Sequence, residues 1–312
     1  MRNNKIIRLN NRDDRVLHFL GTASQLPTKR RNTSAALFRW REHGILLDAG
    51  EGTQRQMFRM GLSVGDVDTV LISHFHGDHV LGLPGLVQSM SLQTENRSLR
   101  IAYPAGGEKY LRNLLRSSTF QMGINIVEIP ISVEGELFKI DDLNIMAYGL
   151  KHKAPSWGFI LKENDKVKYD PAKIKEVGLL NSPLLKKITL DEGVEFEGRT
   201  VTFDMIGEKR KGFKLGYIAD TCLCPSCDII ASGADLLICE STYLEQDAET
   251  AAENNHLTAK QAAAIAARND VKTLVITHFS QRYQDREKMF IEEAGEIFSD
   301  TIMADDLMTI YA

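Results

Sequence analysis

Short apolar runs recur along the chain and stop at polar or glycine-containing segments. Residues 16–20, 70–72 and 236–239 are such runs, and their length is typical of buried strands. Alternating apolar and polar positions at 124–131 and 144–150 predict two more strands. Further strands are expected at 44–48, 101–103, 214–219 and 273–277, and helices at 86–92, at 108–116 and after Thr258, which is a good N-cap residue.

The densest polar cluster follows the run 70–72 directly and contains His74, His76, Asp78 and His79. His74 and His76 are two positions apart on extended backbone, so both rings point to the same side and can reach one ion. Gly77 allows a sharp turn that brings Asp78 and His79 toward a second ion. This set of ligands suits zinc, while manganese or iron would be tolerated. A solvated histidine-rich turn is the alternative, but it does not explain this density at a strand end.

Length, composition and charge limit the number of domains, the kind of partner and the location of the protein. The chain has 312 residues, 43% of them hydrophobic, which is enough for one large domain or two small ones. Its net charge of −4 means that a nucleic acid partner must be held by local basic patches. No apolar run approaches the roughly 20 residues that span a bilayer, and the N-terminus lacks the apolar segment of a signal peptide. We therefore expect a cytoplasmic protein that does not associate with membranes.

The four cysteines agree with a reducing compartment. Cys222, Cys224 and Cys227 crowd one short segment, and Cys239 lies in the apolar run 236–239. A disulfide framework would spread its cysteines along the chain. A structural metal site or a redox-active motif at 222–227 remains the alternative.

Two segments concentrate positive charge. Lys29, Arg30 and Arg31 form three consecutive cations in a loop, for which a solvated surface is the alternative to a binding role. Residues 162–211 are rich in charge and have too few periodic apolar positions to close a core of their own, so we expect a protrusion. Its basic clusters at Lys186 and Lys187 and at 209–211 could meet phosphates by charge.

The motif formed by residues 74–79 resembles the signature of the metallo-β-lactamase superfamily. That resemblance implies an α/β fold, an αβ/βα four-layer sandwich, with a hydrolytic centre of two metal ions. Residues 19–22, 27–32 and 48–54 are similar to motifs of the ribonuclease Z family, whose members remove the 3′ trailer from precursor tRNA. The implied organisation is one metallo-β-lactamase domain over 1–312, with 162–211 inserted as a flexible arm that binds tRNA.

The resemblance also implies a set of metal ligands. Two Zn²⁺ ions per subunit are expected, with Mn²⁺ as a possible replacement. One ion would be held by His74, His76 and His152, the other by Asp78, His79 and His278, and both by Asp220. Asp48 is expected to orient a ligand or the loop beside it.

Proton transfer and RNA binding are implied in the same way. Asp78 would orient the nucleophile or take its proton, and His256, held by Glu240, would protonate the departing 3′ oxygen. Precursor tRNA is the expected partner, bound by a homodimer in which the arm of one subunit can hold tRNA that the other cleaves. The expected substrate-binding residues are Lys29, Arg30, Arg31, Lys186, Lys187 and Arg282.

The chain departs from the family pattern at three places. The turn 103–107 is atypical, Ser182 precedes Pro183 where the arm usually has glycine, and Cys222 stands where arginine is common. Two other functions are compatible with parts of this pattern. A phosphodiesterase or sulfatase of the same fold that acts on small esters would share the ligands but not need the arm, and a non-catalytic RNA-binding protein would not need the whole ligand set.

Overall fold

A computed structural model describes residues 5–10, 14–93, 97–188 and 192–312. The chain divides into two compact units. The larger unit comprises Met1–Phe138, Ile145–Leu161 and Lys214–Ala312, and the smaller comprises Lys139–Asn144 and Lys162–Phe213. The expected metal ligands all belong to the larger unit.

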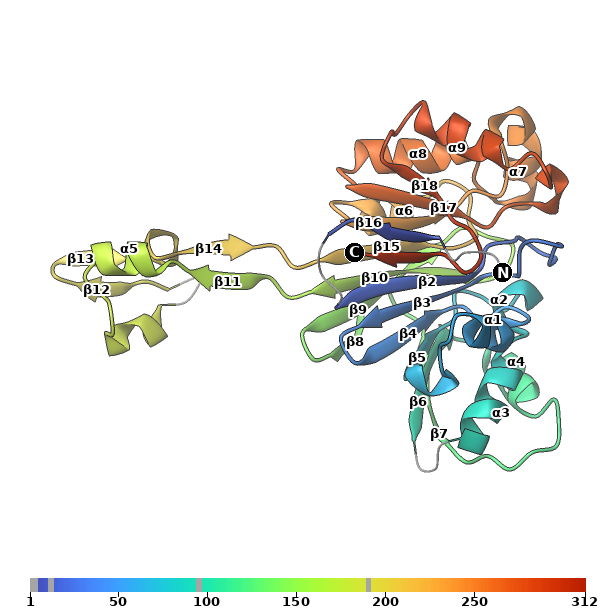
Figure 1. Ribbon diagram of the computed structural model, residues 1–312, viewed down its shortest axis with the longest axis horizontal. Helices are drawn as coiled ribbons and strands as arrows, with labels where there is room; N and C mark the ends of the chain where they lie inside the picture. The colour runs from blue at the N-terminus through green and yellow to red at the C-terminus, as the bar shows by residue number, and fades with distance from the viewer. Residues whose placement is uncertain (1–4, 11–13, 94–96, 189–191) are drawn as a thin grey trace. The chain divides into compact units, whose positions relative to one another are not determined.

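The first sheet of the larger unit has the order β1-β19-β2-β3-β4-β5-β6-β7 over the described residues (Figure 1). Neighbours from β19 to β4 pair antiparallel, whereas β1 is parallel to β19, and β4, β5, β6 and β7 are parallel neighbours. The strands are β1 (Ile6–Arg8), β2 (Arg15–Gly21), β3 (Ala35–Trp40), β4 (His43–Leu47), β5 (Thr69–Leu71), β6 (Ser98–Pro104), β7 (Asn125–Ile131) and β19 (Thr309–Tyr311).

The second sheet has the order β18-β17-β16-β15-β10-β9-β8. From β15 to β18 the neighbours are parallel, so their carboxyl ends lie at one edge of the sheet. The strands are β8 (Gly135–Ile140), β9 (Leu143–Leu150), β10 (Ser156–Glu163), β15 (Lys214–Ile218), β16 (Leu236–Glu240), β17 (Thr273–Thr277) and β18 (Thr301–Met303).

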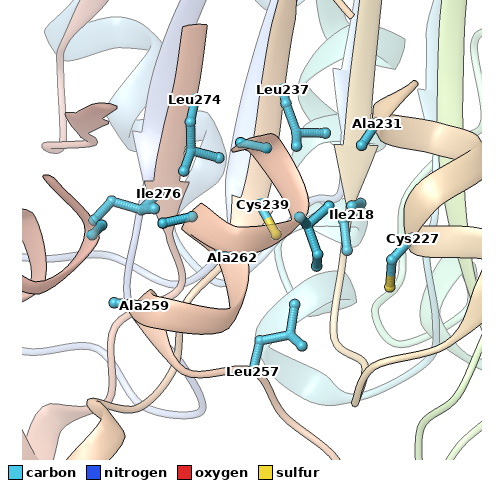
Figure 2. Close-up of a cluster of buried hydrophobic side chains, with 14 of the residues drawn as sticks. Ile218, Cys227, Ala231, Leu237, Cys239, Leu257, Ala259, Ala262, Leu274 and Ile276 are labelled. Atoms are coloured by element: carbon cyan, nitrogen blue, oxygen red, sulfur yellow. The ribbon is translucent and has the colours of Figure 1, made fainter. Parts of the chain in front are cut away.

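Helices cover the outer face of each sheet (Figure 1). Leu46, Val70 and Ile101 pack with the helices beside the first sheet, which are α1 (Thr53–Arg59), α2 (Gly77–Val80), α3 (Leu83–Gln93) and α4 (Glu108–Leu115). Leu237 and Ile276 pack with the helices beside the second sheet (Figure 2). Those are α6 (Pro225–Ala231), α7 (Ala248–Asn254), α8 (Ala259–Arg268) and α9 (Lys288–Gly295), and short 3₁₀ helices span Val64–Asp66, Glu245–Asp247 and Gln281–Tyr283.

The inner faces of the two sheets are buried as well. Leu17 and Phe38 of the first sheet and Ile238 and Val275 of the second have no exposed surface or almost none. Because alternate residues of a strand point to opposite faces, burial at successive positions requires a layer on each side. This arrangement is the α/β four-layer sandwich that the sequence predicts.

The smaller unit contains a core of its own, so the prediction that residues 162–211 could not close one was wrong. Its buried apolar side chains come from separate short elements, which is why no periodic pattern revealed them. They are Ile174, Val177, Leu179, Ile188, Val201, Phe203 and Ile206. The elements are the antiparallel pair β11 (Lys166–Tyr169) and β14 (Gly207–Arg210), the hairpin β12 (Val194–Phe196) and β13 (Arg199–Val201), α5 (Pro171–Glu176), and 3₁₀ helices at Pro183–Lys187 and Phe203–Met205.

No helix in the described part of the chain is both long and apolar enough to cross a membrane.

Candidate metal centre

The histidine-rich segment begins where β5 ends. His74 and His76 follow this strand in extended backbone, and Asp78 and His79 lie in the first turn of α2, which starts at Gly77. The sharp turn predicted at Gly77 is therefore the start of a short helix. Because this helix follows directly, the segment 74–79 places all three histidines and Asp78 at the carboxyl edge of the first sheet.

The first group of convergent side chains consists of His74, His76, His152 and Asp220. His76 Nδ1 lies 3.0 Å from His74 Nε2 and 3.3 Å from His152 Nε2. His152 follows the end of β9, and Asp220 follows the end of β15. Their four ligand atoms all lie within 4.8 Å of one another, so they can contact a single ion.

The second group consists of Asp78, His79 and His278. The Nε2 atoms of the two histidines are 3.3 Å apart, and His278 Nε2 is 3.4 Å from Asp78 Oδ2. His278 directly follows β17 and adopts a left-handed conformation with φ of 65°. A histidine pays a steric cost for this conformation, and such costs are often met at functional sites.

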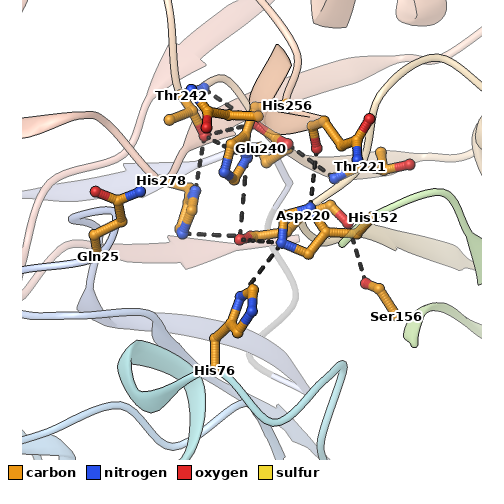
Figure 3. Close-up of polar contacts among 12 residues, drawn as sticks. Gln25, His76, His152, Ser156, Asp220, Thr221, Glu240, Thr242, His256 and His278 are labelled. Carbon is orange, nitrogen blue, oxygen red and sulfur yellow. Dashed lines mark hydrogen bonds and ion pairs between the residues drawn. The ribbon is translucent and has the colours of Figure 1, made fainter. Parts of the chain in front are cut away.

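Asp220 lies between the two groups (Figure 3). Its Oδ1 is 3.3 Å from the Nε2 atoms of both His79 and His278. Its Oδ2 is 3.6 Å from His74 Nε2 and 3.9 Å from His152 Nε2. Each carboxylate oxygen therefore faces a different group, as a ligand shared by two ions would.

The orientation of the rings fits metal binding. Four histidines use Nδ1 for a contact outside the cluster and turn Nε2 inward, which fixes the ring as a ligand would require. The Nδ1 partners are Ser73 Oγ for His74, Asp48 Oδ2 for His79, the Asn255 carbonyl oxygen for His152 and Thr242 Oγ1 for His278, at 2.8–3.0 Å.

The protonation states of the first group suit a cation. Burial lowers the pKa of His74, His76 and His152, so these rings are neutral and offer a lone pair. In the second group, burial opposes a charge on His79, but Asp220, Asp78 and Asp48 outweigh it and raise the pKa of His79, so a cation would replace that proton. Burial opposes ionisation of Asp220, but the charges of His278 and His79 hold its pKa well below the usual range. Oδ1 of Asp220 is buried without a hydrogen-bond donor among the described residues. Imidazole nitrogens and carboxylate oxygens in this arrangement fit zinc and tolerate manganese.

Asp48 supports the cluster from behind. Its fully buried carboxylate accepts hydrogen bonds from the Ser73 amide at 2.7 Å, the Ser73 hydroxyl at 2.8 Å and the Tyr217 hydroxyl at 2.7 Å, and contacts His79 Nδ1 at 2.8 Å. The expectation that Asp48 orients a ligand agrees with these contacts. Sequence reasoning missed Tyr217, which lies inside β15 among apolar residues.

Glu240 and His256 form a second polar pair beside the cluster (Figure 3). Glu240 ends β16, and its Oε1 lies 2.9 Å from His256 Nδ1. Burial disfavours the protonated ring, but the charge of Glu240 and the hydrogen bond to it outweigh this and raise the pKa of His256 to about 9. The Thr242 hydroxyl donates to Glu240 Oε2 at 2.6 Å, so one residue contacts this pair and also His278. Sequence reasoning missed Thr242, although residues 240 and 242 share one side of an extended segment.

The three consecutive cations of the loop 29–31 differ in exposure. Lys29 and Arg30 are exposed, and Arg30 Nη2 lies 3.2 Å from Asp285 Oδ1. Arg31 differs from the expectation that it binds substrate, because its side chain is only 5% exposed and its guanidinium is used inside the protein. It pairs with Glu287 and Asp305 and donates to the Thr22 hydroxyl and the Ala304 carbonyl.

The remaining substrate-binding candidates are on the surface. Arg282 is exposed and pairs with Asp247 at 2.8 Å. Lys186 and Lys187 are exposed at the end of a 3₁₀ helix in the smaller unit. A cavity of about 410 Å³ in the larger unit borders the metal centre at His76 and Asp78, and Gln25 and Pro27 line its other side.

The chain is similar to curated proteins along nearly its whole length. It is 39% identical over 297 residues to Ribonuclease Z of Nocardia farcinica, which covers 95% of this chain and 97% of that protein. It is also 39% identical over 292 residues to Ribonuclease Z of Chlamydia abortus, which covers 94% and 95%. Residues 16–188 match the family model of the anti-Pycsar protein Apyc1.

Solved structures share the fold. The short form of human tRNase Z superposes with a TM-score of 0.69 and 25% identity, covering 95% of this chain and 98% of that one. YhfI of Bacillus subtilis, a metallo-β-lactamase fold protein, superposes with a TM-score of 0.66 and 17% identity, covering 95% and 98%. These likenesses confirm the predicted metallo-β-lactamase sandwich. The chain belongs to the ribonuclease Z family, and its residues 16–188 also fit the Apyc1 family model.

Proposed function

We propose that this protein is a zinc-dependent endoribonuclease that removes the 3′ trailer from precursor tRNA, leaving a 3′-hydroxyl on the tRNA and a 5′-phosphate on the trailer. The observation that carries the proposal is the convergence of five histidines and two aspartates in a member of the ribonuclease Z family. Hydrolysis of a phosphodiester needs a nucleophile active at neutral pH and stabilisation of negative charge, which a pair of bound metal ions supplies.

Two zinc ions per subunit are part of the proposal, with manganese as a possible replacement. His74, His76 and His152 would hold one ion, while Asp78, His79 and His278 would hold the other. Asp220 would contact both, because each of its oxygens faces one group at 3.3–3.9 Å.

The protein's own groups would move the protons. Asp78 lies at the cavity beside the cluster, where its carboxylate can orient the attacking water or accept its proton. Its Oδ2 accepts the backbone amide of Gln25 at 2.7 Å, which fixes the direction of the carboxylate. On the leaving side, Glu240 holds Nδ1 of His256, so Nε2 is the atom that can donate a proton to the departing 3′ oxygen.

Exposed cations would bind the RNA backbone. Lys29 and Arg30 in the larger unit and Lys186 and Lys187 in the smaller unit are positioned at the surface, where phosphate contacts cost little desolvation. Arg282 would join them by exchanging Asp247 for a phosphate. The smaller unit would act as the tRNA-binding arm. We also propose a homodimer, for which light scattering would give about twice the 35.0 kDa mass of one chain.

The deciding experiment incubates the metal-loaded protein with a precursor tRNA, with and without a chelator, and maps the cut ends. Cleavage at the trailer junction that stops with chelator supports the proposal. Activity on small phosphodiesters or sulfate esters without cleavage of precursor tRNA would instead favour the alternative function.

Two variants separate the proposed parts. Deleting residues 165–208 should abolish cleavage of precursor tRNA but spare a small phosphodiester, and unchanged tRNA cleavage would refute the role of the arm. His256→Ala should slow cleavage by about 10²–10⁴-fold, the range of general acid catalysis, without loss of bound metal. Loss of metal would show that His256 is a ligand rather than a proton donor.

A further inference from the structure

A pair of cysteines lies close to the metal centre without taking part in it. Cys224 and Cys227 form a Cys-x-x-Cys motif in the connection between β15 and β16, which are parallel neighbours joined through α6. Their Sγ atoms are 3.6 Å apart. Within the described residues, the groups that could hold a metal ion contain no cysteine, so the structure favours the redox alternative over a structural metal site.

The two thiols differ in accessibility. Cys224 is half-buried, between the exposed residues Leu223 and Pro225. Cys227 is completely buried and belongs to the apolar cluster beside the second sheet, with Ala231 and Leu257 (Figure 2). Cys224 therefore has surface that faces solvent, whereas Cys227 has none. This division of roles suits an attacking and a resolving thiol.

Local hydrogen bonds also make the thiols of Cys224 and Cys227 differ in acidity. A hydrogen bond from Cys227 lowers the pKa of Cys224 to about 5. Burial opposes this effect, and the Thr221 hydroxyl adds to it. The same hydrogen bond, together with burial, raises the pKa of Cys227. The thiolate, which is the nucleophilic form, is thus located on the accessible cysteine.

We propose that Cys224 and Cys227 are a redox site that low-molecular-weight disulfides oxidise reversibly, and that the oxidised form is less active at the neighbouring Glu240–His256 pair. The Cys224 thiolate attacks one sulfur of the small disulfide, forms a mixed disulfide and releases one thiolate. Cys227 then loses its proton and attacks the Cys224 sulfur, which forms the intramolecular disulfide and releases the second thiol. Two electrons and the Cys227 proton pass from the protein to the small disulfide, which becomes one thiol and one thiolate, and the thiolate takes a proton from water.

One residue connects this pair to the polar pair. The Thr221 hydroxyl lies 3.7 Å from Cys224 Sγ, and the Thr221 amide donates to Glu240 Oε1 at 2.9 Å. The same Glu240 oxygen contacts His256 Nδ1. A disulfide needs its sulfurs at about 2.0 Å, so they must close from 3.6 Å, and the shift of Cys224 Sγ changes its contact with the Thr221 hydroxyl. Weakening one hydrogen bond to a charged carboxylate corresponds to about a tenfold loss in rate.

The test equilibrates the metal-loaded full-length protein in glutathione buffers of increasing oxidised fraction and quenches exchange with acid. The protein is then unfolded, and its free thiols are alkylated and counted by mass spectrometry. We expect two of the four cysteines to become protected from alkylation, and peptide mapping should show a disulfide between Cys224 and Cys227. Precursor-tRNA cleavage measured on the same samples should fall about tenfold as the disulfide forms, and a dithiol should restore it.

Variants identify the sulfurs involved. Cys227→Ala should stop at a stable mixed disulfide of Cys224, Cys224→Ser should show no protection, and Cys222→Ser, which keeps the pair intact, should behave as the wild type. All four thiols remaining alkylatable up to full oxidation would refute the redox site. A complete disulfide with unchanged cleavage would refute its connection to Glu240. The thiol count does not depend on RNA cleavage, so this outcome is independent of the proposed function.

Discussion

Asp48→Asn tests whether the buried carboxylate behind the metal centre organises it. The substitution keeps the size of the side chain but leaves one oxygen, which can face the Ser73 hydroxyl, His79 and Tyr217. The amide group must then face the Ser73 backbone N–H, placing two donors together. The unsatisfied amide costs about 1–3 kcal/mol, and losing the charge weakens each of the other three contacts by about 1 kcal/mol.

Relief from burying a charge offsets part of this cost, so we expect unfolding free energy to fall by roughly 3 kcal/mol in metal-free protein. Because Asp48 fixes the His79 ring, zinc affinity should also fall about 10–100-fold. Urea denaturation measures the first effect, and competition with a chromogenic chelator measures the second. Tyr217→Phe is the matched control: it removes one donor, keeps the carboxylate and should cost about 1 kcal/mol. The reasoning is refuted if Asp48→Asn is no less stable than Tyr217→Phe.

Three further predictions concern metal, RNA and pH. Removing metal with a chelator should abolish cleavage and lower the thermal midpoint, and added zinc should restore both; a metal-free protein that still cleaves would contradict the assigned centre. Replacing Lys186 and Lys187 together by alanine should weaken tRNA binding and reduce the slope of log affinity against log salt by about two, whereas an unchanged slope means that these lysines do not meet phosphates. Burial, with the charge of Arg39, lowers the pKa of His18 to about 4. The unfolded chain therefore binds a proton more readily than the folded protein below about pH 6.5. The free energy of unfolding should fall as the pH drops from about 6.5 toward 4, by about 3 kcal/mol in total. Urea denaturation of the metal-free His18→Gln variant should show a smaller fall over this range, and an equal fall would assign the effect to other groups.

The positions of the candidate ligands could be predicted because they follow from local rules. His152, Asp220 and His278 each come directly after a strand or within two residues of its end. Parallel strands bring such positions to one edge of a sheet, and family resemblance then selects which of them hold metal. The assignment of ligands to particular ions remains a prediction, although the structure brings all of these side chains together.

The groups that orient the ligands could not be predicted in the same way. Tyr217 and Thr242 have ordinary sequence neighbours. Even Ser73, which adjoins His74, acts through its contact with Asp48, 25 positions away. The Tyr217 hydroxyl meets a carboxylate 169 positions away in the sequence. Only the packing of the two sheets determines such a pair, because β15 belongs to the second sheet and Asp48 follows the end of β4 in the first.

Arg31 shows how a run of like charges can divide between surface and interior. The Thr28 hydroxyl accepts the amides of Arg30 and Arg31 at 3.2 and 2.9 Å, which turns the chain after two exposed cations. A buried guanidinium is tolerated only when it is paired and its donors are satisfied. Arg31 meets that requirement through Glu287 and Asp305, more than 250 positions away in the sequence. The loop that presents Lys29 and Arg30 is consequently anchored to the C-terminal part of the chain. If these two cations bind RNA as proposed, Glu287→Gln or Asp305→Asn should weaken precursor-tRNA binding in a filter-binding assay, and unchanged binding would contradict the role of the loop.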